Sequence, residues 1–121
     1  MKKILYIEDD HSLRQLIKFI INNRDDLHLL EAETGAAGLQ LALQEAPDII
    51  LLDLSLPDIS GYDILLKLHN TEATAEIPVI AMSGDSLPED IEKGLRAGFR
   101  GYLTKPVDIK KFYATLDAAL K

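Results

Sequence analysis

Three carboxylates, one hydroxyl and one ammonium group stand where short apolar runs of the sequence end. They belong to Glu8, Asp9, Asp53, Ser83 and Lys105. Crowded carboxylates repel one another, and a divalent cation with oxygen ligands, such as Mg2+, relieves that repulsion. A carboxylate can also attack phosphorus and form an aspartyl phosphate, while a cation and a hydroxyl stabilise the phosphoryl oxygens. If the fold brings these five side chains together, the set is sufficient for taking up a phosphoryl group.

Each of these residues also has an ordinary structural interpretation. An aspartate after a strand, such as Asp53, more often forms a turn or caps a helix than acts as a nucleophile. The pair Glu8 and Asp9 is more often a solvated helix start. A lone Ser83 is usually a turn residue, and a lone Lys105 is usually exposed to solvent. Their joint placement at four strand ends favours the chemical interpretation.

Five apolar runs, which we interpret as strands, alternate with segments of helical periodicity. The predicted strands are Ile4–Ile7, Leu27–Leu30, Ile49–Leu52, Pro78–Met82 and Phe99–Leu103. Helical crossovers imply parallel strands with helices on both faces of the sheet. In such a sheet, ligands bind beyond the carboxyl ends of the strands. In the order 2-1-3-4-5, the second strand is at an edge and the other four bring the five side chains to one end.

The predicted helices each carry an apolar stripe. The stripes are Leu13, Leu16, Ile17, Ile20 and Ile21; Leu39, Ala42 and Leu43; Ile64, Leu65 and Leu68; Ile91 and Leu95; and Ile109, Phe112, Tyr113, Leu116 and Leu120. Capping residues precede several of them: Asp10 or Ser12 for the first, Thr34 for the second, and Ser60, with Asp63 at capping-box spacing, for the third. Pro88 can open the fourth helix and Gly98 can close it.

The composition limits the class of protein. The chain has 121 residues, which fits a single domain over 1–121 with no output domain. Its net charge of −7 argues against a nucleic-acid-binding surface. It has no cysteine, which excludes disulfides and thiolate metal sites. No apolar run reaches the roughly 18 residues of a membrane helix. We therefore expect a cytoplasmic protein that neither binds nucleic acid directly nor enters a membrane.

Four segments, in register with one another, resemble the receiver domains of two-component response regulators. They are Ile4–Asp10, Leu52–Gly61, Ile80–Gly84 and Gly98–Pro106. The likeness covers essentially the whole chain. It implies a flavodoxin-like, doubly wound α/β fold of (βα)5 type, with a parallel five-stranded sheet in the order 2-1-3-4-5. It also implies a signalling module that catalyses its own phosphorylation and dephosphorylation, rather than an enzyme.

The resemblance assigns roles to the residues around Asp53, which would be the phosphoacceptor. Asp9 would bind Mg2+ directly, and Glu8 would bind it directly or through water. Asp53 and the backbone carbonyl of Ser55 would supply further ligands. Lys105 would pair with Asp53 and then with a phosphoryl oxygen.

The resemblance also implies a switch. Ser83 would move toward the phosphoryl group and Tyr102 would change rotamer with it. This would alter the face made by the fourth helix, fifth strand and fifth helix. The Lys105–Pro106 peptide bond would be cis. The phosphodonor would be a sensor or hybrid histidine kinase, or a histidine phosphotransfer protein. The effector is not identified, and the chain would be a monomer or an activation-dependent dimer.

Two positions depart from the family pattern, and three alternatives remain open. Glu8 stands where aspartate is commoner, and Arg100 has no assigned mechanism. The chain is either a stand-alone regulator or a receiver from a longer protein such as a hybrid kinase. A degenerate receiver that only binds partners is the first functional alternative. A haloacid-dehalogenase-like phosphohydrolase is the second, but its general acid would fall on Ser55. His11, His28 and His69 lack metal-ligand spacing.

Overall fold

Strands and helices alternate strictly along the chain in the computed structural model, which describes residues 1–121. The elements are β1 (Lys2–Ile7), α1 (His11–Asn22), β2 (Leu27–Ala32), α2 (Gly35–Glu45), β3 (Ile49–Asp53), α3 (Gly61–His69), β4 (Val79–Ser83), α4 (Pro88–Ala97), β5 (Gly101–Thr104) and α5 (Ile109–Leu120). None of these helices has the length and apolar character needed to span a bilayer.

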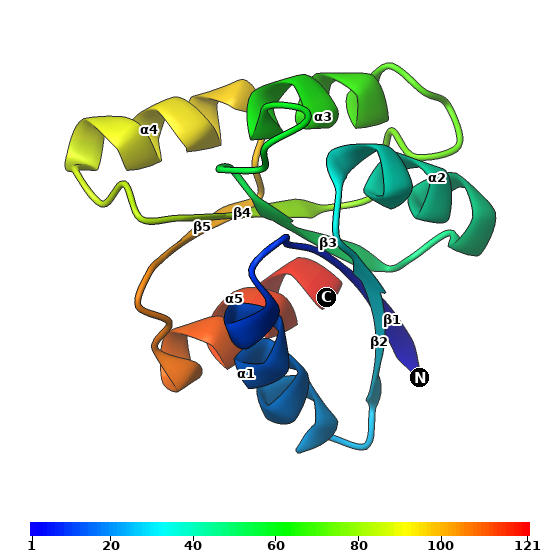
Figure 1. Cartoon of the computed structure of the whole chain (residues 1–121), viewed down its shortest axis with the longest axis vertical. Coiled ribbons are helices and arrows are strands. Elements are labelled where there is room, and N and C mark those ends of the chain that lie inside the picture. Colours follow the sequence, from blue (N-terminus) through cyan, green and yellow to red (C-terminus); the bar gives the residue numbers. More distant parts are fainter.

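The strands form one parallel sheet in the order β2-β1-β3-β4-β5, as predicted. Figure 1 shows α1 and α5 on one face of the sheet and α2, α3 and α4 on the other. In the register, Ile7 lies opposite Leu52, and Ser83 lies opposite Thr104. The carboxyl ends of β1, β3, β4 and β5 therefore meet at one end of the sheet. The predicted site residues lie at this end.

Two apolar cores hold the three layers together, one on each face of the sheet. Beneath α1 and α5, buried residues such as Ile17 and Phe112 pack on Ile4 and Tyr6 of β1. On the other face, residues of α2 and α3 pack on Leu5, Ile7 and the central strands. The central strand β3 is buried along its whole length, which explains its unbroken apolar run.

The helices begin where the sequence supplies a cap. Asp10, Thr34, Ser60 and Asp108 each accept a hydrogen bond from the backbone N–H three residues on. The first helix is therefore capped by Asp10, which decides between the two predicted residues. Helix α4 has Pro88 in its first turn and no side-chain cap.

Strand β5 begins later than predicted, at Gly101 rather than Phe99. Gly98 ends α4 with a φ of 120°, in the region that favours glycine. The N–H of Phe99 then bonds to the carbonyl of Gly94, so Phe99 belongs to the helix cap. Its side chain is buried in the core on the α2–α3 face.

The predicted helical stripes were too wide. Leu16, Leu43, Leu95 and Ile109 lie on exposed surfaces. In α1 the buried residues are Ile17, Ile20 and Ile21, which form a narrower line than the periodicity indicates. A helix that packs on one face of a sheet buries only its line of contact, so residues on the flanks of the stripe face solvent.

Candidate functional site

Glu8 and Lys105 continue the hydrogen-bond ladder of the sheet by one step beyond β1 and β5. The N–H of Glu8 donates to the carbonyl of Ala32 (3.0 Å), and the N–H of Lys105 donates to the carbonyl of Ser83 (2.9 Å). Their backbones are therefore fixed by the sheet rather than by loops.

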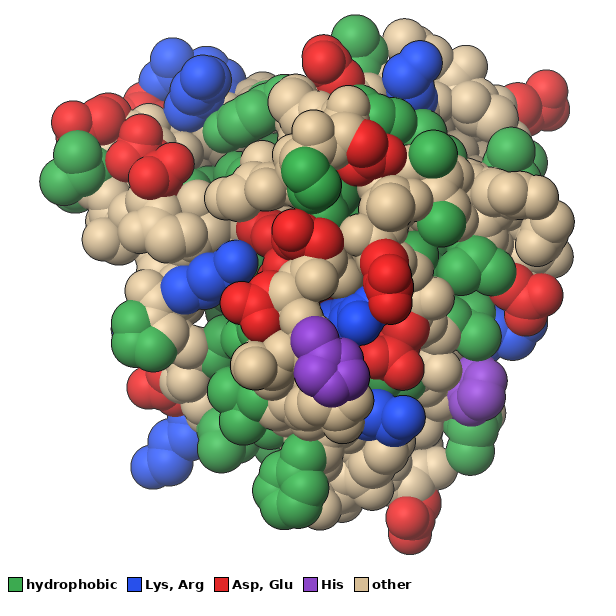
Figure 2. Space-filling model, viewed as in Figure 1, with side chains coloured by type: hydrophobic (Ala, Val, Ile, Leu, Met, Phe, Trp, Pro, Cys, Tyr) green, Lys and Arg blue, Asp and Glu red, His purple; other side chains and the backbone are tan.

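Glu8, Asp9 and Asp53 form an acidic cluster at the carboxyl end of the sheet. Each offers one carboxylate oxygen, and these oxygens all lie within 4.8 Å of one another. Glu8 and Asp53 are each only 1% exposed, whereas Asp9 faces solvent. Figure 2 shows acidic side chains gathered near the middle of the face where β1 and β3 end, with basic side chains beside them.

Lys105 is the cation of the cluster. Its ammonium Nζ lies 3.2 Å from Asp53 Oδ1 and 3.5 Å from Glu8 Oε1. Burial alone would lower the pKa of Lys105, but the charges of Asp53 and Glu8 outweigh it and the pKa is raised. Lys105 therefore stays protonated and offsets part of the negative charge.

The charged form of Glu8 is disfavoured by its burial. Burial raises its pKa from the ordinary 4.5 to about 7, and a hydrogen bond with Asp53 and the charge of Asp53 act in the same direction. The backbone N–H of Asp10, 3.3 Å from Glu8 Oε2, and the charge of Lys105 act against this rise. One cation is thus insufficient to neutralise the cluster.

The donor set fits Mg2+. Three clustered carboxylates, one of them open to solvent, match the preference of this ion for oxygen ligands together with several waters. Glu8, Asp9 and Asp53 would hold it from this chain. The three histidines take no part in the cluster.

Asp53 is oriented by two donors. Its Oδ1 accepts the backbone N–H of Ser55 at 3.1 Å as well as the ammonium of Lys105. Ser55 therefore lies beside Asp53, although the contact observed is through its N–H, and the metal contact expected of its carbonyl stays a prediction. The expected cis peptide bond between Lys105 and Pro106 is present.

Ser83 and Tyr102 are linked to each other rather than to Asp53. Ser83, at the end of β4, is buried, and its Oγ accepts the N–H of Asp85 at 3.0 Å. The hydroxyl of Tyr102 donates to the carbonyl of the same Asp85 at 2.9 Å. The backbone of Asp85 therefore connects the two residues predicted to form the switch.

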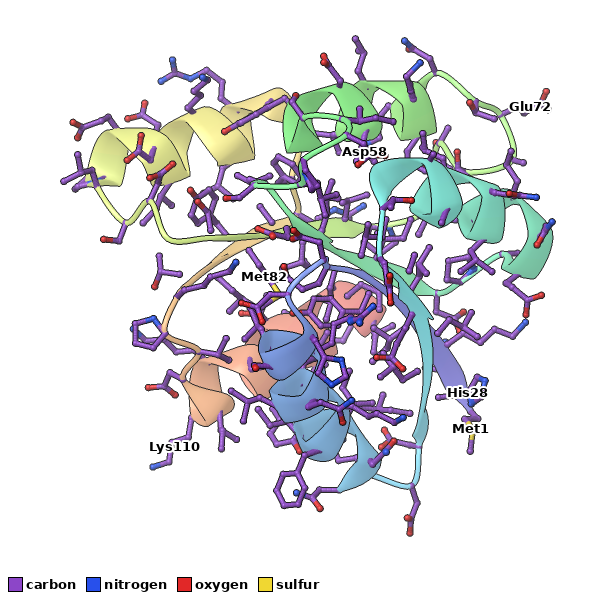
Figure 3. The ribbon with its side chains drawn as sticks, viewed as in Figure 1. Met1, His28, Asp58, Glu72, Met82 and Lys110 are labelled. Carbon is purple, nitrogen blue, oxygen red and sulfur yellow. The ribbon has the colours of Figure 1, made fainter.

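Asp58 holds the loop after β3 against α2. Its carboxylate accepts the backbone N–H groups of Gly35 and Ala36 at 3.0 and 3.1 Å, and Figure 3 shows it between α3 and the start of α2. These two hydrogen bonds lower the pKa of Asp58. The loop that carries Ser55 is thus tied at both ends.

Tyr6 is a residue of the site that sequence reasoning missed. It is fully buried in β1, and its hydroxyl donates to Glu8 Oε1 at 3.2 Å. Burial raises the pKa of Tyr6, and the charges of Glu8 and Asp53 raise it further, so the hydroxyl stays a donor. The available signal was its place two residues before Glu8, which puts both side chains on one face of the strand.

Comparisons with known proteins agree on one family. A profile described as the response regulator receiver domain matches residues 4–117. Protein PilH of Pseudomonas aeruginosa is 33% identical over 99% of this chain and 98% of its own length. A DNA-binding dual master transcriptional regulator of Synechocystis, RpaA, is 34% identical, but the chain spans only 50% of that protein. The chain thus covers about half the length of some relatives and nearly all of others.

A solved structure agrees with the fold in detail. The receiver domain of a sensor histidine kinase from Pseudomonas aeruginosa superposes with a TM-score of 0.88 at 25% identity, covering 98% of this chain and 97% of that one.

Proposed function

The chain belongs to the receiver domain family of response regulators, and from this we propose that Asp53 accepts a phosphoryl group from a phosphohistidine. The donor would be a sensor or hybrid histidine kinase, or a histidine phosphotransfer protein, in the cytoplasm. The observation that carries the proposal is the buried Asp53 carboxylate, held by Lys105 and Ser55 beside Glu8 and Asp9.

In the proposed transfer, one Asp53 carboxylate oxygen forms a bond to phosphorus. The bond between phosphorus and the imidazole nitrogen of the donor breaks, and that nitrogen keeps the electron pair and takes up a proton. The product is an acyl phosphate on Asp53. Lys105, already 3.2 Å from Asp53, would pair with a phosphoryl oxygen, and Ser83 would donate a hydrogen bond to another.

Mg2+ is the proposed cofactor, and bound Mg2+ would neutralise charge on the phosphoryl oxygens. The acidic cluster supports this, as does the similar kinase receiver domain, which is described with a magnesium ion coordinated in its active site cleft. We assign Asp9 as a direct ligand, Glu8 as a direct or water-mediated ligand, and Asp53 and the Ser55 carbonyl as the others.

The proposed output is a change at the face formed by α4, β5 and α5. If Ser83 Oγ turns to the phosphoryl group, the N–H of Asp85 loses its acceptor. Because Tyr102 is bonded to the carbonyl of the same residue, its side chain would respond to that movement. Tyr102 also lines a hollow of about 500 Å³ between these elements, so its rotation would reshape the surface that an effector contacts.

The phosphoacceptor is tested with acetyl phosphate and Mg2+. The parent protein is expected to gain one phosphoryl group in intact mass, in a form cleaved by hydroxylamine, as an acyl phosphate is. Asp53→Asn should gain none. Asp25→Asn is the matched control, because Asp25 is exposed in the turn before β2. Equal labelling of Asp53→Asn and the parent would refute the assignment, and a parent that never labels would favour the degenerate receiver.

A further inference from the structure

Tyr6 lies beneath the acidic cluster and contacts one of its members from the core. We propose that Tyr6 is a positioning residue that fixes the Glu8 carboxylate for metal binding, so that the longer glutamate can serve at this position. This inference rests on the proposed function, because it concerns the metal site of that function.

The hydroxyl of Tyr6 is buried and has one hydrogen-bond partner, Glu8 Oε1, at 3.2 Å. A buried hydroxyl without a hydrogen-bond partner is destabilising in proteins, so this contact matters to both residues. The aromatic ring packs among Ile4, Met82 and Phe112 in the core beneath α1 and α5. The donor is therefore held in place by packing and cannot follow Glu8 if Glu8 moves.

Glu8 is held by three donors, and Tyr6 is the only one that comes from the core. Oε2 accepts the N–H of Asp10 at 3.3 Å, and Oε1 lies 3.5 Å from the ammonium of Lys105. Lys105 is nearer to Asp53 and is the group that would move to a phosphoryl oxygen. During phosphorylation, Tyr6 would thus be the fixed donor left on Oε1.

A glutamate needs this support more than an aspartate would. Its extra methylene adds a rotatable bond, and fixing that bond costs side-chain entropy when the metal binds. A rigid hydroxyl that already orients the carboxylate reduces this cost. Partners of this kind, which hydrogen-bond a metal ligand, typically change metal affinity by about 10–100-fold when they are removed.

The test is the affinity of the full chain for Mg2+, measured by calorimetry, in Tyr6→Phe. The variant keeps the ring and its packing, so it should fold, and its affinity should fall by about 10–100-fold. Tyr113→Phe is the matched control. It also removes one tyrosine hydroxyl bond, from Tyr113 to the carbonyl of Ile20 at the α1–α5 contact, outside the acidic cluster. It should bind Mg2+ as the parent does.

The second arm repeats Tyr6→Phe in a Glu8→Asp background and follows both the affinity and the metal-free Tm. Because aspartate is one methylene shorter, we expect it not to reach the hydroxyl and to leave that hydroxyl unpaired. Removing the hydroxyl in this background should therefore leave the affinity for Mg2+ unchanged and should raise the Tm. A purely structural role for Tyr6 would instead lower the Tm equally in both backgrounds.

Two results distinguish a failure of the Tyr6 inference from a failure of the proposed function. If the parent binds Mg2+ and Tyr6→Phe binds it equally well, or if the loss is the same in both backgrounds, the inference is wrong and the proposed function stands. If the parent itself binds no Mg2+, the metal site of the proposed function fails, and the inference fails with it.

Discussion

At Glu8, burial conflicts directly with the charge of the carboxylate. It is almost inaccessible to water, and burial together with Asp53 raises its pKa to about 7 in the metal-free protein. The folded state therefore binds a proton at Glu8 more tightly than the unfolded chain does. Its contribution to stability is complete below the unfolded pKa of about 4.5 and is lost as the pH rises through about 7.

We expect the free energy of unfolding of the metal-free protein to decrease between pH 5 and pH 8 by at most about 3 kcal/mol from this group. Urea denaturation in EDTA at several pH values measures the decrease. Glu8→Gln should flatten the profile, since it carries no titrating carboxyl. An equally steep profile in Glu8→Gln would assign the effect to other groups.

Some residues of the acidic cluster and its surroundings could be predicted from the sequence, and others could not. Asp53 could be predicted because an unbroken apolar run leads directly to it, and Lys105 because it follows the last strand. Tyr6 could not, because a tyrosine within an apolar run normally predicts packing alone. Its hydrogen bond depends on the length of the Glu8 side chain and on which face of β1 the two residues share.

At the scale of elements, Gly94 of helix α4 leaves room for the ring of Tyr102 in strand β5. A Cβ at Gly94 would lie 2.8 Å from Cδ2 of the Tyr102 ring, nearer than side-chain atoms normally approach. The absence of a side chain lets the ring lie against the helix while its hydroxyl reaches Asp85. Helix α4 and strand β5 thus fit together only while Gly94 stays small.

Gly94→Ala is expected to displace the Tyr102 ring and release the loop that carries Asp85. Alanine also favours the helix by about 1 kcal/mol, so overall stability should change little. Amide hydrogen exchange at residues 85–87 should become faster. Gly84→Ala is the matched control, because a Cβ there meets no atom within 4 Å. Unchanged exchange in Gly94→Ala would show that Tyr102 does not restrain the loop.

Element type and order could be predicted well, whereas element ends could not. Period-2 and period-3.6 patterns separate strands from helices, and parallel strands must present their carboxyl ends together. The start of β5 was missed because Phe99 suits a strand by composition. Gly98 determines where α4 ends, because its positive φ lets the N–H of Phe99 bond to the carbonyl of Gly94. Phe99 therefore belongs to the helix cap and not to the strand.

At the scale of the whole molecule, the acidic cluster links metal binding to global stability. A ligand that binds only the folded protein stabilises it by about 2.7 kcal/mol at a free concentration 100 times the dissociation constant. Mg2+ should act in this way because the cluster exists only when β1 and β3 are paired.

We therefore expect Mg2+ to raise the Tm of the parent and EDTA to reverse the rise. Thermal unfolding followed by circular dichroism measures it, with sodium chloride of equal ionic strength as the control. Asp9→Ala should lose most of the effect, because Asp9 is the exposed member of the cluster and the proposed direct ligand. A rise of equal size in Asp9→Ala would place the bound ion elsewhere.

The contact between Lys105 and Glu8 joins residues that stand close to opposite ends of the sequence. A chain emerging from the ribosome has made Glu8 and Asp53 long before it makes Lys105, so during synthesis the two carboxylates have no lysine partner. Contacts this distant along the chain carry a large loop-closure entropy during folding. The cluster therefore gains the ammonium group of Lys105 only when the last strand has joined the sheet, and a nascent or truncated chain without that strand lacks the cation that pairs with Asp53.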